Sequence, residues 1–107
     1  METLDQLVDK FVYSAIQHGL AMKEGGGRKA NRWLKKVSVI YQKIAEIGCE
    51  ERLKPLLNHE NEYVRLSVAC LAKELFPDEA EKVLKKLTKS SDPYVYISAR
   101  CSLDKRF

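Results

Sequence analysis

A repeat of 31 residues determines the fold expected for this chain. Residues 53–72 read LKPLLNHENEYVRLSVACLA, and residues 84–103 read LKKLTKSSDPYVYISARCSL. Seven of the twenty aligned positions are identical: Leu53/Leu84, Lys54/Lys85, Leu56/Leu87, Tyr63/Tyr94, Val64/Val95, Ser67/Ser98 and Cys70/Cys101. Because self-similarity at a fixed period of this length is typical of stacked helical units, the stretch predicts a repeat architecture.

Both copies carry the signals of a helix start. Asn61 and Asp92 occupy the same position, and side chains of these types accept hydrogen bonds from the free amides of a first helical turn. Pro93 follows at the first helical position, where its missing N–H costs nothing. Apolar residues then return at helical spacing: Val64, Val68, Leu71 and Leu75 in one copy, and Val95, Ala99 and Leu103 in the other.

The first half of the chain continues this pattern. One apolar stripe, introduced by a predicted capping box of Thr3 and Gln6, contains Leu4, Leu7, Val8, Phe11, Ala15 and Ile16. A second contains Trp33, Val37, Ile40, Ile44 and Ile47, with Gly48 as a stop signal. After a shift of 31 residues, four members of this stripe align with the apolar positions of the repeat: Trp33, Val37, Ile40 and Ile44. This helix is therefore interpreted as a degenerate first copy.

Helical spacing almost everywhere predicts an all-α fold, an α-solenoid of antiparallel helix pairs. The expected helices are residues 3–22, 28–47, 50–58, 61–76, 78–90 and 92–104, about six in all, with Pro55 shortening or kinking the third. They form one domain over residues 1–107, with a degenerate first unit at 3–47 and repeats at about 50–76 and 78–104.

Composition narrows the class of protein. The chain has 107 residues, 45% of them hydrophobic and 32% charged, which suits one globular domain. The sequence shows neither an apolar run long enough to span a membrane nor the pattern of a signal sequence, so a cytoplasmic location is expected. Cys49, Cys70 and Cys101 lack CxxC spacing and indicate a reduced compartment, with Cys70 and Cys101 expected to be buried. His18 and His59 lack metal-ligand spacing and suit surface and turn positions, so no metal or cofactor is predicted.

Charge is unevenly distributed along the chain. The net charge is +4, but residues 46–81 carry nine acidic and four basic side chains, whereas the segments on either side are basic. A middle third of this kind would repel a nucleic acid lying along the whole chain. The acidic segment therefore favours a basic protein as partner; the alternative is a structural role, because several of these carboxylates suit helix starts, where they interact with the helix dipole.

The stretch GGGRKANRW at residues 25–33 raises the question of a phosphate cradle. It lacks the Ser or Thr and the preceding strand of a Walker loop, so a flexible turn is the preferred interpretation. The alternative is anion binding at the start of the next helix through Arg28, Lys29, Arg32 and Lys36. Helical spacing predicts that the basic residues of this helix lie away from the Trp33 stripe, and no run of aromatic residues accompanies them.

The repeat motifs carry a family resemblance. Asn61-Glu62-Tyr63-Val64-Arg65 and Asp92-Pro93-Tyr94-Val95 resemble the second helix of HEAT-like repeats, although Tyr96 replaces the arginine in the later copy. Together with Ala30-Asn31-Arg32 and Leu56-Leu57-Asn58-His59, they are similar to a small bacterial family of uncharacterised single-domain HEAT-like proteins. Some small proteins of this kind act as immunity proteins against interbacterial toxins, as in contact-dependent inhibition, and the resemblance implies that role by analogy.

These observations predict a non-enzymatic protein-binding module, in its most specific form an immunity protein that blocks a basic nuclease toxin. The expected contact residues are Glu50, Glu51, Glu60, Glu62, Tyr63, Arg65, Tyr94 and Tyr96. An alternative is nucleic-acid binding through the basic faces of residues 28–43 and 82–89. An enzyme of the base-excision type ranks last, because the sequence singles out no acid, aromatic pocket or nucleophile.

Overall fold

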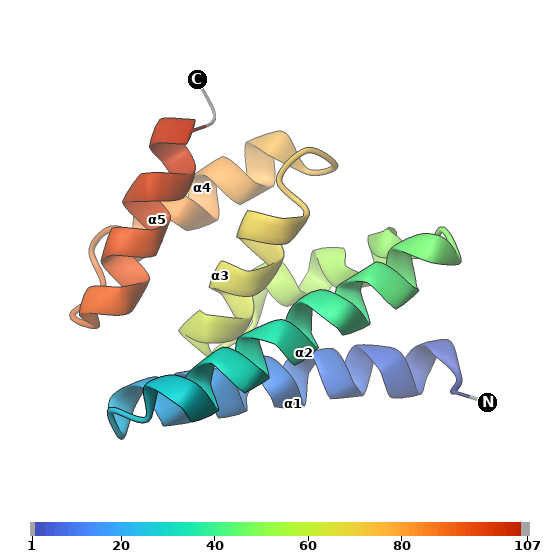
Figure 1. Ribbon diagram of the computed structural model, residues 1–107. Helices are drawn as coiled ribbons and strands as arrows, with labels where there is room; N and C mark the ends of the chain where they lie inside the picture. Colours follow the sequence, from blue (N-terminus) through green and yellow to red (C-terminus); the bar gives the residue numbers. More distant parts are fainter. Residues whose placement is uncertain (1, 106–107) are drawn as a thin grey trace. The chain divides into compact units, whose positions relative to one another are not determined.

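The computed structural model describes residues 2–105 and confirms the all-α class, with no strand in that range (Figure 1). Its elements are α1 (Leu4–Lys23), α2 (Gly27–Glu46), the 3-10 helix η1 (Glu50–Asn58), α3 (Glu62–Leu71), α4 (Pro77–Leu87) and α5 (Pro93–Lys105). The chain divides within η1 into two compact units: the first ends at Leu53 and the second begins at Lys54.

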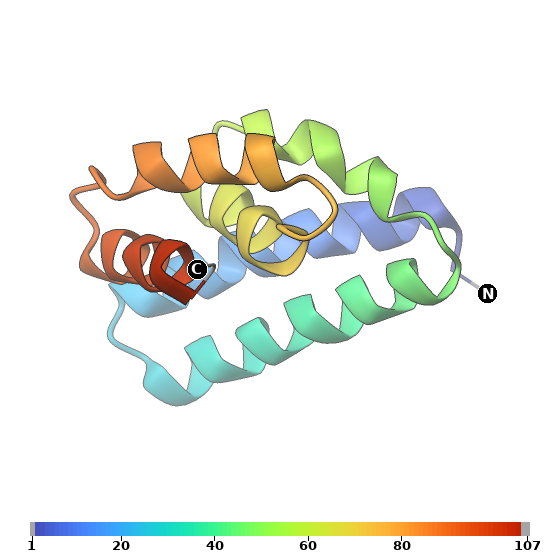
Figure 2. The same ribbon diagram turned by 90° about the horizontal axis from the view of Figure 1, so that it is seen from above.

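The first unit is an antiparallel pair of long helices, α1 and α2 (Figure 2). The capping box predicted at Thr3 is confirmed, since the Gln6 amide donates to the Thr3 hydroxyl at 3.1 Å and the Thr3 amide donates to the Gln6 side chain at 2.9 Å. The helices bury apolar side chains that include Leu7, Phe11 and Ala15 from α1 and Val37, Ile40 and Ile44 from α2. This burial of two stripes is the main source of stability in the pair.

Gly48 stops α2 as predicted. Its φ is +71°, its N–H donates to the Ala45 carbonyl at 2.9 Å, and the Cys49 N–H donates to the Ile44 carbonyl at 3.1 Å. This left-handed conformation costs an L-residue with a side chain about 1–2 kcal/mol. Since no atom lies within 4 Å of the place a Cβ would take, the cost of adding one is conformational.

Gly48→Ala should therefore lower the free energy of unfolding by about 1–2 kcal/mol, measured by urea denaturation. Gly27→Ala is the matched control, because Gly27 starts α2, lacks a positive φ and also has open space around it. There the alanine should stabilise the protein by about 0.5 kcal/mol. A loss of stability in both variants would contradict the conformational explanation.

The second unit reproduces the 31-residue period in its geometry. Helices α3 and α5 begin 31 positions apart, at Glu62 and Pro93. The Asn61 Oδ1 accepts from the amides of the second and third helical residues at 2.9 and 3.3 Å, and the Asp92 Oδ1 accepts from the equivalent amides at 3.0 and 3.4 Å. Both predicted N-caps are confirmed.

Matching apolar positions of the two copies are buried. Val64 and Val95 are both 0% exposed, and Leu53 and Leu84 are 0% and 1% exposed. Within the second unit α4 packs against both α3 and α5, and α3 also contacts α5.

Helix α3 ends earlier than the apolar pattern predicts, at Leu71 and not at residue 76. The Leu75 and Phe76 amides both donate to the Ala72 carbonyl in a turn, and Pro77 begins α4. Proline disfavours helical geometry for the residue that precedes it. Phe76 therefore takes a non-helical conformation, and the chain turns between the end of α3 and Pro77. Leu75 therefore lies outside the helix and is 48% exposed, contrary to its predicted place on the buried stripe.

Three other burial predictions are wrong. Ile47 follows the last residue of α2 and is 55% exposed. Cys101 is exposed, because the buried side of α5 runs through Val95, Ala99 and Ser102. His18, expected at the surface, is 3% exposed and lies seven residues after Phe11 on the buried side of α1, where burial lowers the pKa of its imidazole.

Candidate functional site

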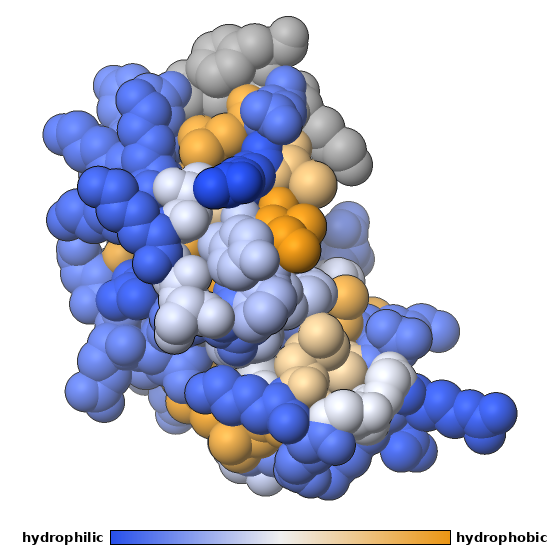
Figure 3. Space-filling model, turned by 90° about the vertical axis from the view of Figure 1, so that its left-hand side faces the viewer, coloured by the Kyte–Doolittle hydropathy of each residue, from blue (hydrophilic) through white to orange (hydrophobic). Residues whose placement is uncertain are grey.

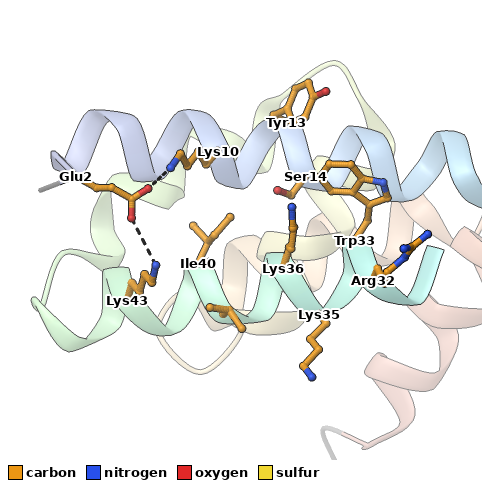
Figure 4. Close-up of a pocket in the computed structure, with 11 residues that line it drawn as sticks. Glu2, Lys10, Tyr13, Ser14, Arg32, Trp33, Lys35, Lys36, Ile40 and Lys43 are labelled. Carbon is orange, nitrogen blue, oxygen red and sulfur yellow. Dashed lines mark hydrogen bonds and ion pairs between the residues drawn. The ribbon is translucent and has the colours of Figure 1, made fainter. Parts of the chain in front are cut away.

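A groove of about 630 Å³ runs along the first unit between α1 and α2 (Figure 4). We call it the α1–α2 groove, and the residues that line it are Glu2, Lys10, Tyr13, Ser14, Arg32, Trp33, Lys35, Lys36, Val39, Ile40 and Lys43. Five of these side chains are cationic and one is a carboxylate. The groove therefore combines apolar surface with a positively charged edge.

Helical spacing brings these residues together. On α2, Trp33, Lys36, Ile40 and Lys43 follow one another at intervals of three, four and three, which places them on one side of the helix. Lys10 and Tyr13 are likewise three residues apart on α1. In Figure 4 the Trp33, Lys36 and Lys43 side chains extend from α2 toward α1, whereas Lys35 points away from it.

An aromatic pair forms one end of the groove. The rings of Tyr13 and Trp33 meet edge to face, with centroids 5.7 Å apart and planes at 75°. Tyr13 is 57% exposed, and Val39, another lining residue, is 47% exposed. Large apolar side chains gathered at the surface in this way mark a binding site more often than singly exposed ones do.

Cations surround this apolar surface. The Lys36 Nζ lies 4.8 Å from the centroid of the Trp33 ring, a cation–π contact. At the other end, Lys10 from α1 and Lys43 from α2 both bind the Glu2 carboxylate, the latter at 3.4 Å. These contacts, with the Lys10 hydrogen bond as the largest cause, lower the pKa of Glu2.

The groove changes the interpretation of the predicted phosphate site. Arg32 and Lys36 line it, whereas Arg28 and Lys29 are exposed at the start of α2 and do not. The prediction that the basic residues lie away from the Trp33 stripe is wrong for Lys36, because its long side chain folds back over the ring. The preceding glycines form a turn, in which Gly25 has a φ of +76°.

The predicted acidic contact residues are not gathered in one unit. Glu50 and Glu51 open η1 in the first unit, and Glu60 and Glu62 belong to the second. Glu51 and Glu60 are exposed, but Glu62 is half-buried and accepts a hydrogen bond from the Ser90 hydroxyl at 2.9 Å. Glu62 therefore has a structural contact within the repeat.

The predicted tyrosines and Arg65 also make contacts inside the second unit. Tyr63 is 2% exposed, stacks on Tyr94 at 5.7 Å, and donates its hydroxyl to the Asp92 carboxylate at 2.8 Å. Burial, followed by this hydrogen bond, raises the pKa of Tyr63. Its ring is not on the surface, so the contact role predicted for Tyr63 does not fit its position.

Arg65 and Tyr96 are half-buried. The Arg65 guanidinium donates to the His59 carbonyl at 3.2 Å, and Tyr96 lies 5.7 Å from the guanidinium of Arg100. The His59 Nδ1 accepts a hydrogen bond from the Asn61 amide at 3.0 Å, which confirms the turn role predicted for His59. The Arg65 and His59 contacts stabilise the turn before α3, and the Tyr96–Arg100 contact lies within α5.

The second predicted basic face lies on α4. Lys82 and Lys86 line a cavity of about 200 Å³, and Lys86 and Lys89 line a neighbouring one of about 290 Å³. Lys85 instead pairs with Glu81 at 3.1 Å. Among residues 2–105, no aromatic side chain lines either cavity, so the described part of this face lacks the feature that distinguishes the α1–α2 groove.

Other kinds of site find no support in the part of the chain that is described. Among residues 2–105, no three His, Cys, Asp or Glu side chains are placed to hold a metal ion. Within the same residues, none of the helices has the length and apolar character to cross a membrane. On the face shown in Figure 3, hydrophilic side chains predominate and the hydrophobic ones gather in small groups.

Comparisons with known proteins return no match to this chain among protein families, curated proteins or solved structures. Function is therefore inferred from the groove and its chemistry.

Proposed function

We propose that the protein is a non-enzymatic binding module of the HEAT-like solenoid type and that its partner binds in the α1–α2 groove. The observation that carries this proposal is the pair of exposed Tyr13 and half-buried Trp33, flanked by cationic side chains. Trp, Tyr and Arg are the residue types most enriched in binding hot spots. The shared capping geometry of α3 and α5, 31 residues apart, supports the repeat assignment.

The composition of the groove favours a protein over a nucleic acid. Single-stranded nucleic acids bind by stacking bases on open aromatic faces along a basic track. Here Lys36 lies over the Trp33 ring, and the aliphatic side chains of Val39 and Ile40 complete the lining. Apolar side chains of a protein suit such a surface, and the five cations favour a partner with acidic residues beside them.

An immunity protein that binds a toxin remains the most specific form of this proposal. The groove and the acidic residues make opposite demands on the partner, however. Binding through the groove requires an acidic surface on the toxin, whereas binding through Glu50, Glu51 and Glu60 requires a basic one. The alternative of nucleic-acid binding through residues 28–43 and 82–89 needs both basic faces.

Three charge-reversed variants separate these possibilities. The tagged protein is used to isolate a partner from its host after nuclease treatment, and the affinity of the purified partner is then measured by calorimetry for each variant. Arg32→Glu with Lys36→Glu changes the groove, Lys82→Glu with Lys86→Glu is the matched control on α4, and Glu51→Lys with Glu60→Lys tests the acidic residues. Circular dichroism verifies that each variant is folded.

We expect the groove variant to weaken binding by about tenfold or more and the other two to change it by less than about twofold. Loss of binding in the Glu51/Glu60 variant alone would transfer the site to the acidic residues. Equal losses in the groove variant and the α4 variant, with nucleic acid recovered when nuclease is omitted, would support the nucleic-acid alternative. Either result would overturn the proposal for the groove.

A further inference from the structure

The α1–α2 groove already contains one carboxylate. It lies at the end of the groove opposite the Tyr13–Trp33 pair and shows that this end binds a carboxylate. Glu2 precedes α1, and its side chain is 33% exposed. Lys10 from one helix and Lys43 from the other converge on it. Among the described residues that line the groove, it is the one acidic side chain. Two lysines from different helices thus form a carboxylate-binding subsite.

From these contacts we infer that the groove binds an acidic amphipathic helix of a partner protein, one carboxylate of which replaces that of Glu2 between Lys10 and Lys43. This inference rests on the proposed function and adds the kind of segment that is bound. Glu2 then acts as an internal competitor for the partner. Its removal should strengthen binding, whereas the loss of any ordinary contact residue weakens it.

The spacing of the subsites argues for a helix in the groove. Lys43 and Trp33 are ten residues apart on α2, which at 1.5 Å per residue separates the carboxylate subsite from the aromatic pair by about 15 Å. Lys36 lies between them, about 10 Å from Lys43 along the helix axis. An amphipathic helix spans this distance in two to three turns and presents acidic and apolar residues on one side.

Both cationic and apolar side chains of the groove would contact such a helix. A partner helix with a Phe or Leu at one end would place that side chain against the Tyr13–Trp33 pair, and an apolar residue about two turns further along would lie beside Val39 and Ile40. Acidic residues on the same side, about one and three turns away, would meet Lys36 and the Lys10–Lys43 pair. Because Glu2 neutralises part of the pair in the free protein, its displacement is a cost that the partner has to offset.

The test uses the fluorescence of Trp33, the single tryptophan of the chain. The probes are a 16-residue helical peptide without tryptophan, carrying one Phe and two Glu on one side at the subsite spacing, its analogue with Gln at both Glu positions, and the oligonucleotide (dT)12. Each is titrated against the native protein, Glu2→Gln, and Asp5→Asn. Asp5 pairs with Arg52 outside the groove, so its variant is a matched control for the loss of one negative charge.

We expect saturable binding of the acidic peptide, about tenfold weaker binding of the Gln analogue, and about threefold tighter binding of the acidic peptide to Glu2→Gln. Asp5→Asn should leave the affinity unchanged. Lys10→Glu with Lys43→Glu should abolish the preference for the acidic peptide.

Each contrary outcome has a defined meaning. Unchanged affinity in Glu2→Gln would overturn the competitor role while leaving the groove as a peptide site. Equal binding of the acidic and Gln peptides would overturn the carboxylate subsite. Binding of (dT)12 alone would overturn both this inference and the proposed function. Absence of all binding would reject the acidic helix as ligand, and the partner-affinity experiment with groove variants would then decide the proposed function separately.

Discussion

Replacing Tyr63 with alanine should lower the free energy of unfolding by about 3–5 kcal/mol, in the range of large aromatic truncations in protein cores. The ring is 2% exposed and stacks on Tyr94 with the planes 7° apart. Its hydroxyl donates to Asp92, the N-cap of α5, at 2.8 Å. The substitution therefore removes buried surface, a ring contact and a link between the two capped turns. Urea denaturation followed by circular dichroism measures the change.

Two further variants separate packing from hydrogen bonding at this position. Tyr63→Phe keeps the ring and should cost about 1–2 kcal/mol, because the hydrogen bond has a charged acceptor. Tyr96→Ala, at a half-buried position on α5, should cost less than Tyr63→Ala. If Tyr63→Ala instead left stability unchanged and weakened partner binding, the contact role predicted from the sequence would hold and the structural role would not.

Features encoded by neighbouring residues can be predicted from the sequence. The caps at Asn61 and Asp92 depend on a side chain and the amides two and three positions later, so the residue type and its place before an apolar pattern are sufficient. The helix stop at Gly48 is equally predictable, because the positive φ that ends the helix at this position favours glycine. The end of α3 is harder to predict, since the apolar pattern continues to Leu75 although Pro77 already restricts the residue before it.

The groove depends on which sides of two helices meet, and a single sequence does not contain that information directly. The intervals between Trp33, Lys36, Ile40 and Lys43 are visible in the sequence, but charge alone assigns the lysines to solvent. Their long apolar stems allow them to cover an aromatic ring while the ammonium group stays in water. No sequence signal marks Glu2, because its role arises only when Lys10 and Lys43 are brought together.

The acidic contact residues illustrate the opposite error. Glu60, Glu62 and Tyr63 are close together in the sequence, and that closeness suggests a shared surface. At the first turn of a helix, however, successive side chains point in directions about 100° apart. Glu60 precedes the N-cap of α3 and is exposed, whereas within the first turn Glu62 turns to the Ser90 hydroxyl and Tyr63 is buried. Neighbours in sequence therefore divide between surface and interior.

Helix geometry also accounts for the second large effect, at Phe11 and Tyr13 on α1. Residues two positions apart on a helix lie about 200° apart around its axis. Phe11 is 0% exposed and Tyr13 is 57% exposed, in contact with Trp33 at the groove. Phe11→Ala should lower the free energy of unfolding by about 3–5 kcal/mol, because it leaves a cavity in the core of the first unit.

Tyr13→Ala is the matched variant, with the opposite pattern of effects. It should cost less than about 1 kcal/mol of stability, since most of the ring is already in water, and weaken binding of the acidic peptide by about tenfold. Denaturation and Trp33 fluorescence titration on the same two proteins measure both quantities. A loss of stability in Tyr13→Ala as large as that in Phe11→Ala would mean that the aromatic pair is part of the core, and the groove would then lose its role as a binding site. Separate effects on stability and binding at positions two residues apart would assign folding to one side of α1 and recognition to the other.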